Sequence, residues 1–414
     1  MDASNAAIHA RSPEDNTGET ERQEPCPKPV VAIFRSPLFN ASETFVRTHV
    51  ASLERFRPLL VGLDDRGNVP TGLRDLMILP ESGLDRLRLR LLGPSPALVR
   101  RVRAHRPAVL HAHFGPDGLA ALPLARMLGI PLVTTLHGYE VSRSDARLLT
   151  SGRLSWMRYA LQGRQLMAGG DLFVAVSEAV RRRAIERGYP ADRTFMIHNG
   201  IDLGRFAPTG ARPEAGLILH VGRLVEKKGT SLLIRAFAQV RAQYRDARLV
   251  VIGDGPLRAG LERQAAQQRL PGAVTFLGER SPEDVAEWMR RAWLLAVPSL
   301  TARDGDAEGL PTVIIEAAAA SLPVVASDHS GAPEAVVDGR SGFVIPEGNQ
   351  QALACRLLDL LGSEPLRAAM AATSRVLAQE HFNPSRQTRL LEAQYDGLCH
   401  RYPRAASVTA APIS

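Results

Sequence analysis

Two glutamates in the second half of the chain, Glu308 and Glu316, are candidates for ligand binding or catalysis. Glu308 precedes a Gly-Leu-Pro-Thr run, and Glu316 stands inside an apolar stretch of valine, isoleucine and alanine. A helix that is apolar on all sides is buried, and an ionised carboxylate in such a helix needs a partner. Its sequence neighbours supply none, so we expect the partner of Glu316 to be another protein group or a ligand.

The run Gly309, Leu310, Pro311, Thr312 is predicted to form the start of a helix. Proline suits the first turn of a helix, where its missing N–H group has no partner to lose. The free N–H groups of a helix start attract anions. Glu316 lies a little over one turn further in, where a carboxylate can accept both hydroxyls of a ribose and so satisfy its oxygens. A structural glutamate paired with an arginine of the same domain is the alternative interpretation.

A cationic cluster occurs earlier in the chain, directly after an apolar run. Gly222 would allow a ligand to approach the backbone closely. Arg223 and Lys228 would add two positive charges near a helix start, so a diphosphate is the natural ligand. Lysine is rare here, with three lysines against 48 arginines, and two of the three are Lys227 and Lys228. A basic surface turn is the alternative, and neither a G-x-G-x-x-G nor a Walker A sequence supports a dinucleotide or ATP site.

Histidines and paired aspartates raise the question of further sites. His137 follows an apolar run and precedes a glycine, which places it to reach a cleft; a buried structural histidine is the alternative. His111 and His113 share one face of a strand, but the strand supplies no third ligand, so we predict no metal there. Asp304 and Asp306 look like the D-x-D of metal-dependent sugar transferases, but they lie in a polar loop away from a first-domain strand end. We interpret that pair as a chance match.

Short apolar runs separated by helical stretches must position these residues. The runs expected to form buried strands are 29–34, 59–62, 109–113, 132–136 and 172–176, then 217–221, 248–252, 274–277, 293–297 and 322–326. The stretches expected to be helical include 42–55, 96–105, 119–128, 231–243, 256–268 and 282–291. Strands that alternate with helices indicate parallel sheets covered on both faces. Two such doubly wound domains facing each other place a cleft between the carboxyl ends of their strands.

The length of 414 residues predicts two domains. We expect an N-terminal acceptor domain over 28–205 and a C-terminal donor domain over 206–375, with a linker rich in proline, glycine and alanine between them. Residues 376–400 are expected to form one long helix that crosses back to the first domain. The segments 1–27 and 401–414 are expected to be a disordered and a flexible tail.

Positive charge is concentrated in the first half. Residues 28–205 carry 26 Lys/Arg against 15 Asp/Glu, whereas 206–414 carry 23 against 22. A basic surface suits an anionic membrane or nucleic acid, and a solvated arginine-rich surface is the plain alternative. No nucleic-acid motif is present, so we expect no nucleic acid. No apolar run is long enough to span a membrane, no signal peptide is visible, and three unpatterned cysteines fit the cytosol.

The second half resembles a known family of enzymes. Arg223 and Lys228, then Glu308 and Glu316 with Gly-Leu-Pro between them, then Ser-Gly-Ala-Pro-Glu at 330–334 are similar to the motifs of retaining glycosyltransferase family 4. The similarity runs over most of the chain. The family has the GT-B fold, which consists of two facing Rossmann-like, doubly wound α/β domains with an interdomain cleft.

The first half resembles one branch of that family. Ser-Glu-Thr-Phe at 42–45, His-Ala-His-Phe-Gly at 111–115 and Thr-Leu-His-Gly-Tyr-Glu at 135–140 look like transferases of the colanic-acid and amylovoran type, which build bacterial exopolysaccharide. Many relatives carry a double glycine in the loop after the first strand, whereas this chain has none over 36–44.

The resemblance implies a role for each site residue. Arg223 and Lys228 would hold the diphosphate of a nucleotide-diphospho-sugar, Glu316 its ribose, and Glu308 the hydroxyls of the transferred sugar. The residues expected to bind this donor are Gly222, Arg223, Lys228, Gly309, Leu310, Pro311, Thr312 and Glu316. His137 would lie near the reacting carbon on the acceptor side, and the catalytic set would be His137, Arg223, Lys228 and Glu308. No metal and no cofactor besides the donor substrate are expected.

The sequence therefore predicts a retaining, metal-independent glycosyltransferase. The acceptor would be a saccharide on a lipid diphosphate, and the basic first domain would bring the enzyme to the inner face of the cytoplasmic membrane. A GT-B nucleotide-sugar epimerase, a basic nucleic-acid-binding module and a catalytically inactive partner subunit are the alternatives. The base and sugar of the donor, the acceptor linkage, the oligomeric state and any role of the N-terminal tail do not follow from the sequence.

Overall fold

The structure, a computed structural model, describes residues 27–39, 43–67, 69–210 and 212–402. The tails predicted over 1–27 and 401–414 lie almost entirely outside these residues. Residues 40–42, which include part of the 36–44 loop and the first residue of the predicted helix 42–55, also fall outside them.

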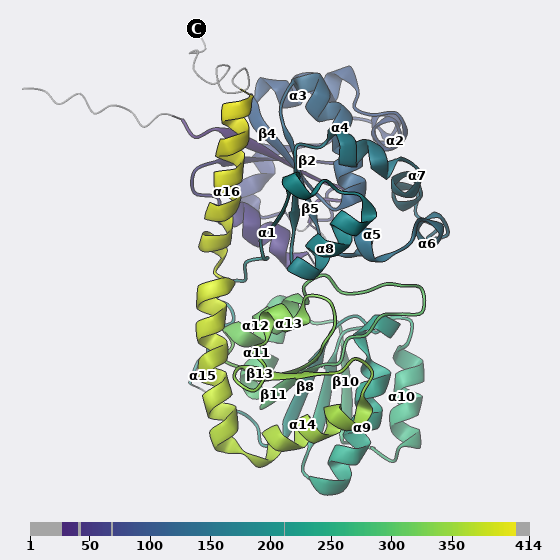
Figure 1. The fold of residues 1–414 in the computed structure, drawn as a ribbon, viewed down its shortest axis with the longest axis vertical. Helices are drawn as coiled ribbons and strands as arrows, with labels where there is room; N and C mark the ends of the chain where they lie inside the picture. The colour runs from purple at the N-terminus through teal and green to yellow at the C-terminus, as the bar shows by residue number, and fades with distance from the viewer. Residues whose placement is uncertain (1–26, 40–42, 68, 211, 403–414) are drawn as a thin grey trace, which may run out of the picture.

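The first half forms a parallel sheet of seven strands in the order β3-β2-β1-β4-β5-β6-β7 (Figure 1). The strands are β1 (Val30–Arg35), β2 (Arg57–Gly62), β3 (Met77–Ile78), β4 (Pro107–His113), β5 (Leu132–Leu136), β6 (Leu172–Ala175) and β7 (Thr194–Met196). The α-helices are α1 (Thr44–Ala51), α2 (Gly83–Leu91), α3 (Pro96–Ala104), α4 (Gly115–Leu128), α5 (Tyr139–Ser142), α6 (Asp145–Leu149), α7 (Leu154–Gly169) and α8 (Glu178–Arg187). Every residue of β4 and β5 is buried, as expected for parallel strands covered on both faces.

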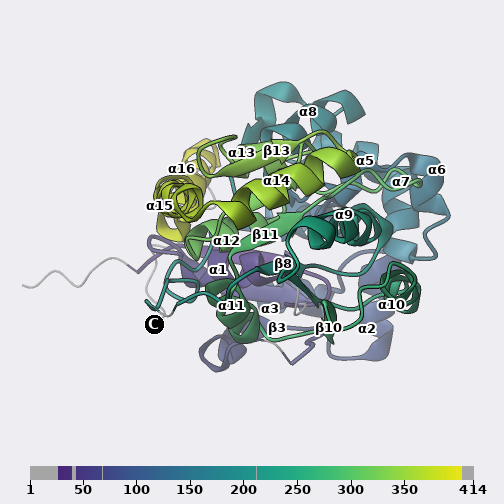
Figure 2. The same cartoon turned by 90° about the horizontal axis from the view of Figure 1, so that it is seen from below.

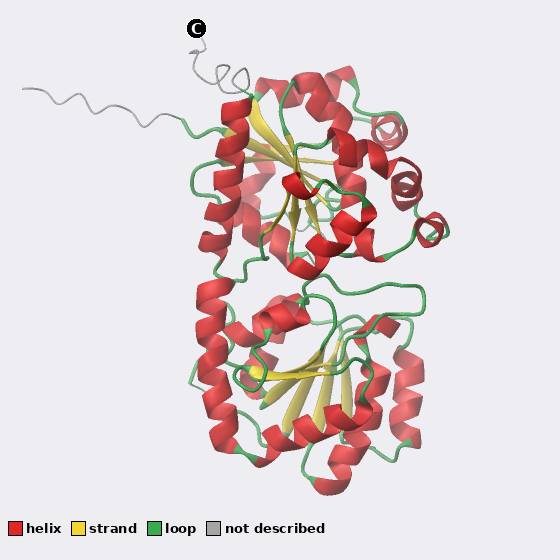
Figure 3. Cartoon of the chain, in the orientation of Figure 1, coloured by secondary structure: helices red, strands yellow, loops and turns green. Residues whose placement is uncertain are grey.

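The second half repeats the design with a parallel sheet of six strands in the order β10-β9-β8-β11-β12-β13 (Figures 2 and 3). The strands are β8 (Leu217–Val221), β9 (Arg248–Ile252), β10 (Val274–Gly278), β11 (Leu294–Val297), β12 (Val324–Ser327) and β13 (Gly342–Ile345). The helices are η3 (Glu226–Lys228), α9 (Thr230–Gln243), α10 (Arg258–Gln267), α11 (Pro282–Arg291), α12 (Thr312–Ala319), α13 (Ala332–Ala335) and α14 (Gln350–Gly362).

The predicted strands are confirmed, and three further strands were not predicted. The runs 132–136, 217–221 and 248–252 coincide with β5, β8 and β9. The missed strands β3, β7 and β13 are two to four residues long and lie at sheet edges, and each falls in an apolar run of only three or four residues, which is a weak strand signal.

The single helix expected over 376–400 is instead two helices, α15 (Glu364–His381) and α16 (Pro384–Arg401). The side chain of Asn383 caps α16 by accepting from the N–H of Arg386, and Pro384 takes the first helical position. These are the signals of a new helix start. The break separates α15, which runs along the second domain, from α16, which runs along the first domain (Figure 1).

Helix α16 is fastened to the first domain by a buried glutamate. One carboxylate oxygen of Glu392 accepts hydrogen bonds from the backbone N–H groups of Glu54, Arg55 and Phe56 at 3.0, 2.8 and 3.1 Å. Leu391, Tyr395 and Leu398 of the same helix join the apolar cluster beneath the first sheet. Residues from the far end of the described chain thus complete the core of the first domain.

The chain crosses between the two domains twice, and the crossings touch. The N–H of Ile201 donates to the carbonyl of Phe382 at 2.9 Å. A Cβ atom on Gly200 would lie 2.5 Å from the Cα of Pro384, so only glycine fits there.

Among the described residues, no helix combines the length and the apolar character that crossing a bilayer demands.

Candidate active site

The carboxyl ends of the two sheets meet at a point of backbone contact. A Cβ atom on Gly309 would lie 1.9 Å from the carbonyl oxygen of His137, and one on Gly138 would lie 2.7 Å from the Cα of Gly309. Gly138 also has a φ of 117°, a conformation that favours glycine. The segment after β5 and the segment before α12 therefore approach each other as closely as two chains can, and the predicted residues His137 and Glu308 lie on either side of this contact.

Two further contacts join the domains nearby. Ser177 Oγ donates to the carbonyl of Gly309 at 3.3 Å. The carboxylate of Glu334 accepts from the N–H groups of Glu178 and Ala179, at the start of α8, at 2.8 and 3.0 Å. A carboxylate at a helix N-terminus is favourably placed. These hydrogen bonds hold the two domains together, so the residues on either side of the contact form a single interdomain site.

The second domain supplies the cations. Lys228 lies in η3, after the turn that follows β8, and its side chain covers Gly222, where a Cβ atom would lie 3.1 Å from Lys228 Cδ. Gly229 then adopts a left-handed φ of 65°, and a Cβ atom there would lie 1.8 Å from the carbonyl oxygen of Pro298. The glycines on either side of this turn fix where the Lys228 ammonium points.

Lys228 and Glu308, predicted to bind different parts of a donor, are paired with each other. Lys228 Nζ lies 3.2 Å from Glu308 Oε1, and Lys227 Nζ lies 3.7 Å from the same oxygen. Burial alone would raise the pKa of Glu308, but the ammonium groups of Lys228 and Lys227 hold it below its ordinary value. Glu308 is therefore ionised at neutral pH, and its charge offsets part of the positive charge of the two lysines.

Arg223 differs from Lys228 in being exposed. Its guanidinium forms no hydrogen bond or ion pair with any other residue that the structure describes. The two predicted diphosphate cations thus share one turn, one of them paired and the other facing solvent.

Helix α12 places Glu316 as predicted, a little over one turn from its start. Pro311 occupies the cap position and Thr312 is the first helical residue, one position later than expected. Within the described residues, the side chain of Glu316 has no hydrogen bond and no ion pair, so the alternative of a Glu–Arg pair is not found. Burial raises the pKa of Glu316 to about 7, although the positive charges of Lys228 and Arg205 oppose that shift.

The Asp304 and Asp306 pair is held by cations from both domains. The guanidinium of Arg143, which follows α5 in the first domain, pairs with Asp304 and lies 3.8 Å from Asp306. Lys227 Nζ lies 3.1 Å from Asp306. These ion pairs give the two aspartates a role in joining the domains, a role that the sequence did not indicate.

The first domain supplies His137 from the end of β5. Its backbone N–H donates to the buried carboxylate of Glu140 at 2.9 Å, and its ring packs against Phe45 and Phe114 at centroid distances of 4.5 and 4.4 Å. His137 Nε2 lies 3.2 Å from His113 Nδ1. Burial, together with the nearby charge of Arg35, lowers the pKa of His137 to about 3, so the imidazole is neutral.

The reason for predicting no metal at His111 and His113 was the lack of a third ligand, and that reason is wrong. His49 of α1 brings a third imidazole to the same place, with one nitrogen of each ring within 4.8 Å of the others. Sequence spacing could not reveal it because α1 precedes β4 by more than fifty residues.

A buried ion-pair cluster beside the cleft was also missed. Arg35, the last residue of β1, pairs with Glu43 at 2.5 Å and with Asp117 at 2.6 Å. The N–H of Ser36 donates to Asp117 at 2.8 Å. Burial raises the pKa of Asp117 to about 6, against the opposing charge of Arg35. An acidic residue within the otherwise apolar start of α4 was the signal available in the sequence.

Two family descriptions match this chain in succession. Residues 42–205 match the model described as Glycosyltransferase Family 4, and residues 205–376 match the model described as Glycosyl transferases group 1. The amylovoran biosynthesis glycosyltransferase AmsK of Erwinia amylovora is 30% identical over 369 residues, covering 86% of this chain and 88% of that protein. The putative colanic acid biosynthesis glycosyltransferase WcaL of Salmonella typhimurium is 33% identical over 290 residues, covering 68% and 69%.

Solved structures confirm the predicted fold. Anabaena Alr3699/HepE, solved in complex with UDP, superposes with a TM-score of 0.71 at 23% identity, over 89% of this chain and 100% of that one. Sucrose-phosphate synthase from Thermosynechococcus elongatus superposes with a TM-score of 0.69 at 19% identity, over 90% and 99%. The chain therefore has the GT-B arrangement of two facing Rossmann-like domains.

Proposed function

The chain belongs to the glycosyltransferases of family 4 and group 1, and from this premise we propose that it transfers a sugar, with retention, from a nucleotide-diphospho-sugar to a saccharide carried on a lipid diphosphate. The product would be a bacterial exopolysaccharide or another cell-surface glycan. The observation that carries the proposal is the pairing of Lys228 with Glu308 at the point where the two domains touch.

That ion pair suits a donor that carries its own negative charge. A diphosphate would replace the Glu308 carboxylate as the partner of the Lys228 ammonium, and the exposed guanidinium of Arg223 would supply a second positive charge. Glu308, released from the lysine, could then accept hydroxyls of the sugar. Relatives support the donor class, because Alr3699/HepE has been solved with UDP and with UDP-glucose.

The same cations would assist the departure of the leaving group. As the bond from the sugar to the diphosphate breaks, negative charge develops on the phosphate oxygen, and preplaced cations stabilise that charge most when water is excluded. Because the proposed site contains no protein nucleophile, we infer that the acceptor attacks from the same face as the leaving group. The acceptor hydroxyl oxygen forms the new bond to the sugar carbon, the bond from that carbon to the phosphate oxygen breaks, and this phosphate oxygen takes the hydroxyl proton.

Glu316 is proposed to bind the ribose. Its carboxylate forms no hydrogen bond or ion pair with the described residues, and the charge of Lys228 acts on it. An ionised carboxylate accepts hydrogen bonds on both oxygens and donates none, so accepting two ribose hydroxyls would favour the ionised form of Glu316. Binding would thereby lower a pKa that stands at about 7 without a ligand.

A thermal-shift screen tests the donor site. We expect one of UDP, GDP and ADP to raise the melting temperature, because a ligand that binds the folded state stabilises it. Lys228→Ala should abolish the shift, and the control Lys28→Ala, at an exposed lysine before β1, should retain it. If no nucleoside diphosphate stabilises the protein at millimolar concentration, the donor assignment is wrong. Conversion of a free nucleotide-sugar without any acceptor would favour the epimerase.

The proposed acceptor places the first domain at the inner face of the cytoplasmic membrane. On α2, Leu84 and Leu87 are 80% and 51% exposed, and Leu92 just beyond the helix is 82% exposed. Arginines 86, 88 and 90 lie among them in the sequence. Exposed leucines next to arginines are the composition with which a helix lies in an anionic interface.

Vesicle co-sedimentation tests membrane binding. The protein should pellet with anionic vesicles and be released by salt, since a basic surface is screened within about 10 Å at 0.1 M salt. Leu84→Ser combined with Leu92→Ser should weaken the binding. Leu390→Ser, at an exposed leucine of α16, should leave it unchanged. Binding that ignores both lipid charge and salt would contradict this surface.

A further inference from the structure

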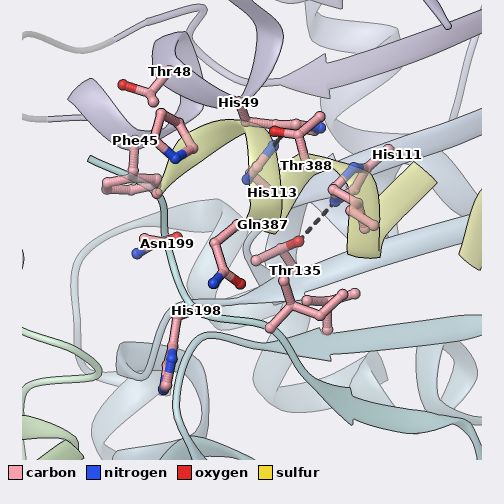
Figure 4. A pocket seen from close by; sticks show the side chains of 15 residues that line it. Phe45, Thr48, His49, His111, His113, Thr135, His198, Asn199, Gln387 and Thr388 are labelled. Atoms are coloured by element: carbon pink, nitrogen blue, oxygen red, sulfur yellow. Dashed lines mark hydrogen bonds between the residues drawn. The ribbon is translucent and has the colours of Figure 1, made fainter. Parts of the chain in front are cut away.

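Three imidazoles meet at the carboxyl end of β4, where one of them, His113, lies next to His137. His111 and His113 project from one face of the strand, and His49 approaches from α1. One ring nitrogen of each lies within 4.8 Å of the others. Figure 4 shows these rings gathered at the wall of a cavity.

The spacing of two of these rings fits a metal better than a hydrogen bond. His49 Nδ1 lies 3.4 Å from His113 Nε2. Hydrogen bonds between a nitrogen donor and its acceptor have typical lengths of about 2.7–3.2 Å. Two nitrogens bound to one tetrahedral zinc ion at about 2.0–2.1 Å are about 3.3–3.4 Å apart. This pair is therefore already at the edge length of a zinc tetrahedron.

The outer nitrogen of each ring has a partner, as metal-ligating histidines require. His113 Nδ1 lies 3.2 Å from His137 Nε2, and His49 Nε2 lies 3.3 Å from the hydroxyl of Tyr395. His111 has Tyr395 OH at 2.5 Å on one nitrogen and Thr135 Oγ1 at 2.7 Å on the other, so whichever nitrogen binds, the other stays hydrogen-bonded.

A cavity of about 40 Å³ gives access to the three rings. Its other walls include the polar side chains of Thr48, Asn199, Gln387 and Thr388, which Figure 4 labels. About 10–15 Å³ is enough for one water molecule. A metal at the three rings could thus keep one position open to a water in the cavity, as three-histidine zinc sites do.

We propose that His49, His111 and His113 bind one divalent transition-metal ion of the zinc class, with the fourth position facing this cavity. The ion would tie α1 to β4 and, through the outer hydrogen bond of His113, orient His137. It would not contact the donor diphosphate, so the transfer step proposed above remains metal-independent. Nitrogen ligands alone favour zinc, copper and nickel over magnesium or calcium.

Metal content of the full chain tests the site without reference to activity. Protein stripped with a chelator and dialysed against Zn²⁺ should retain one zinc per chain, and titration with Co²⁺ should give the strong visible bands of a four-coordinate site. His49→Gln and His113→Gln should each abolish stoichiometric binding. Tyr395→Phe, which keeps the ring and removes only the outer hydroxyl, should weaken the affinity about 10–100-fold.

His105→Gln serves as the control, because His105 is exposed beyond the end of α3 and lies outside the cluster. It should bind metal like the wild type. Wild-type protein that retains no zinc after dialysis would overturn the proposal and leave the imidazoles as a hydrogen-bonded cluster. Equal zinc retention by His49→Gln, His113→Gln and the wild type would overturn it as well, even if all variants fold.

Discussion

Beside the contact between Gly138 and Gly309, the second domain presents the charges of Lys228 and Glu308, whereas His137 and His113 of the first domain present neutral rings. Lys227, Lys228 and Glu308 form an ion-pair cluster in which both lysine side chains are partly exposed. His137 and His113 lie across the contact, buried deeply enough for their pKa values to fall far below neutrality. Glu308 is buried as well, so the neighbouring ammonium groups, rather than the depth of burial, keep that wall charged.

In the proposed function, this difference would separate the two substrates. A diphosphate needs lasting positive charge, which the charged wall would offer once the Glu308 carboxylate is displaced. An acceptor hydroxyl is neutral until it reacts, so neutral rings would hold it and add no attraction for phosphate.

Removal of the lysine from the charged wall should have the largest consequence. Lys228→Ala should lower the turnover number by about a hundredfold or more, because a preplaced cation at a leaving group contributes about 3 kcal/mol. Steady-state kinetics with the donor found in the thermal-shift screen measures this. Lys28→Ala is the matched control. Turnover near the wild-type value in both Lys228→Ala and Glu308→Ala would remove the basis for the charged wall.

Replacement of the ring on the neutral wall should affect transfer but not donor binding. His137→Asn should reduce the turnover number by about thirtyfold, or ~2 kcal/mol, the range for a hydrogen bond to a group that gains charge. Calorimetric affinity for the nucleoside diphosphate should stay within twofold of the wild type. A matching loss of nucleotide affinity would show that His137 serves the donor and that the division is wrong.

The free energy of unfolding of the unliganded protein should fall as the pH rises through the titration of Glu316. Its pKa of about 7 is raised, so between about pH 4.5 and 7 the folded state holds a proton that the unfolded state releases, and the free energy of unfolding falls across that window. Above pH 7 the full loss remains. Glu316→Gln lacks this contribution and should be about 1–2 kcal/mol more stable than the wild type at pH 8.

The same substitution should weaken nucleotide binding, because an amide cannot accept from both ribose hydroxyls with equal strength. Urea unfolding at pH 5 and pH 8, together with calorimetry at pH 8, separates the two effects. If Glu316→Gln is less stable at pH 8 and binds nucleotide normally, then Glu316 is a structural residue.

The ion pairs that join the two walls should have the smallest effect. Arg143→Gln removes the cation between Asp304 and Asp306 and should cost about 0.5–1 kcal/mol of stability, as partly exposed ion pairs do. We expect the Michaelis constant for the donor to change a few-fold and the turnover number to stay constant. Thermal melts at low and high salt measure the stability, and the difference between variant and wild type should shrink as salt rises.

Local signals in the sequence predicted the fold and the charged wall, whereas the neutral wall depends on contacts between distant segments. Continuous apolar runs identified the strands, and the scarcity of lysine drew attention to Lys228. By contrast, His49 joins His113 across more than sixty residues, and Arg143 reaches Asp304 across 161. Pairings of this kind follow from how α1 and α5 pack on the first sheet, which no spacing rule encodes.

Helix α16 gives an unusual order to the making of this protein. Leu391, Tyr395 and Leu398 complete the core beneath the first sheet, and Glu392 satisfies three backbone N–H groups after α1. A ribosome delivers those residues after the whole second domain has emerged. We therefore expect the second domain to finish folding first, because the first domain, although it is synthesised earlier, cannot complete its core until α16 has been made.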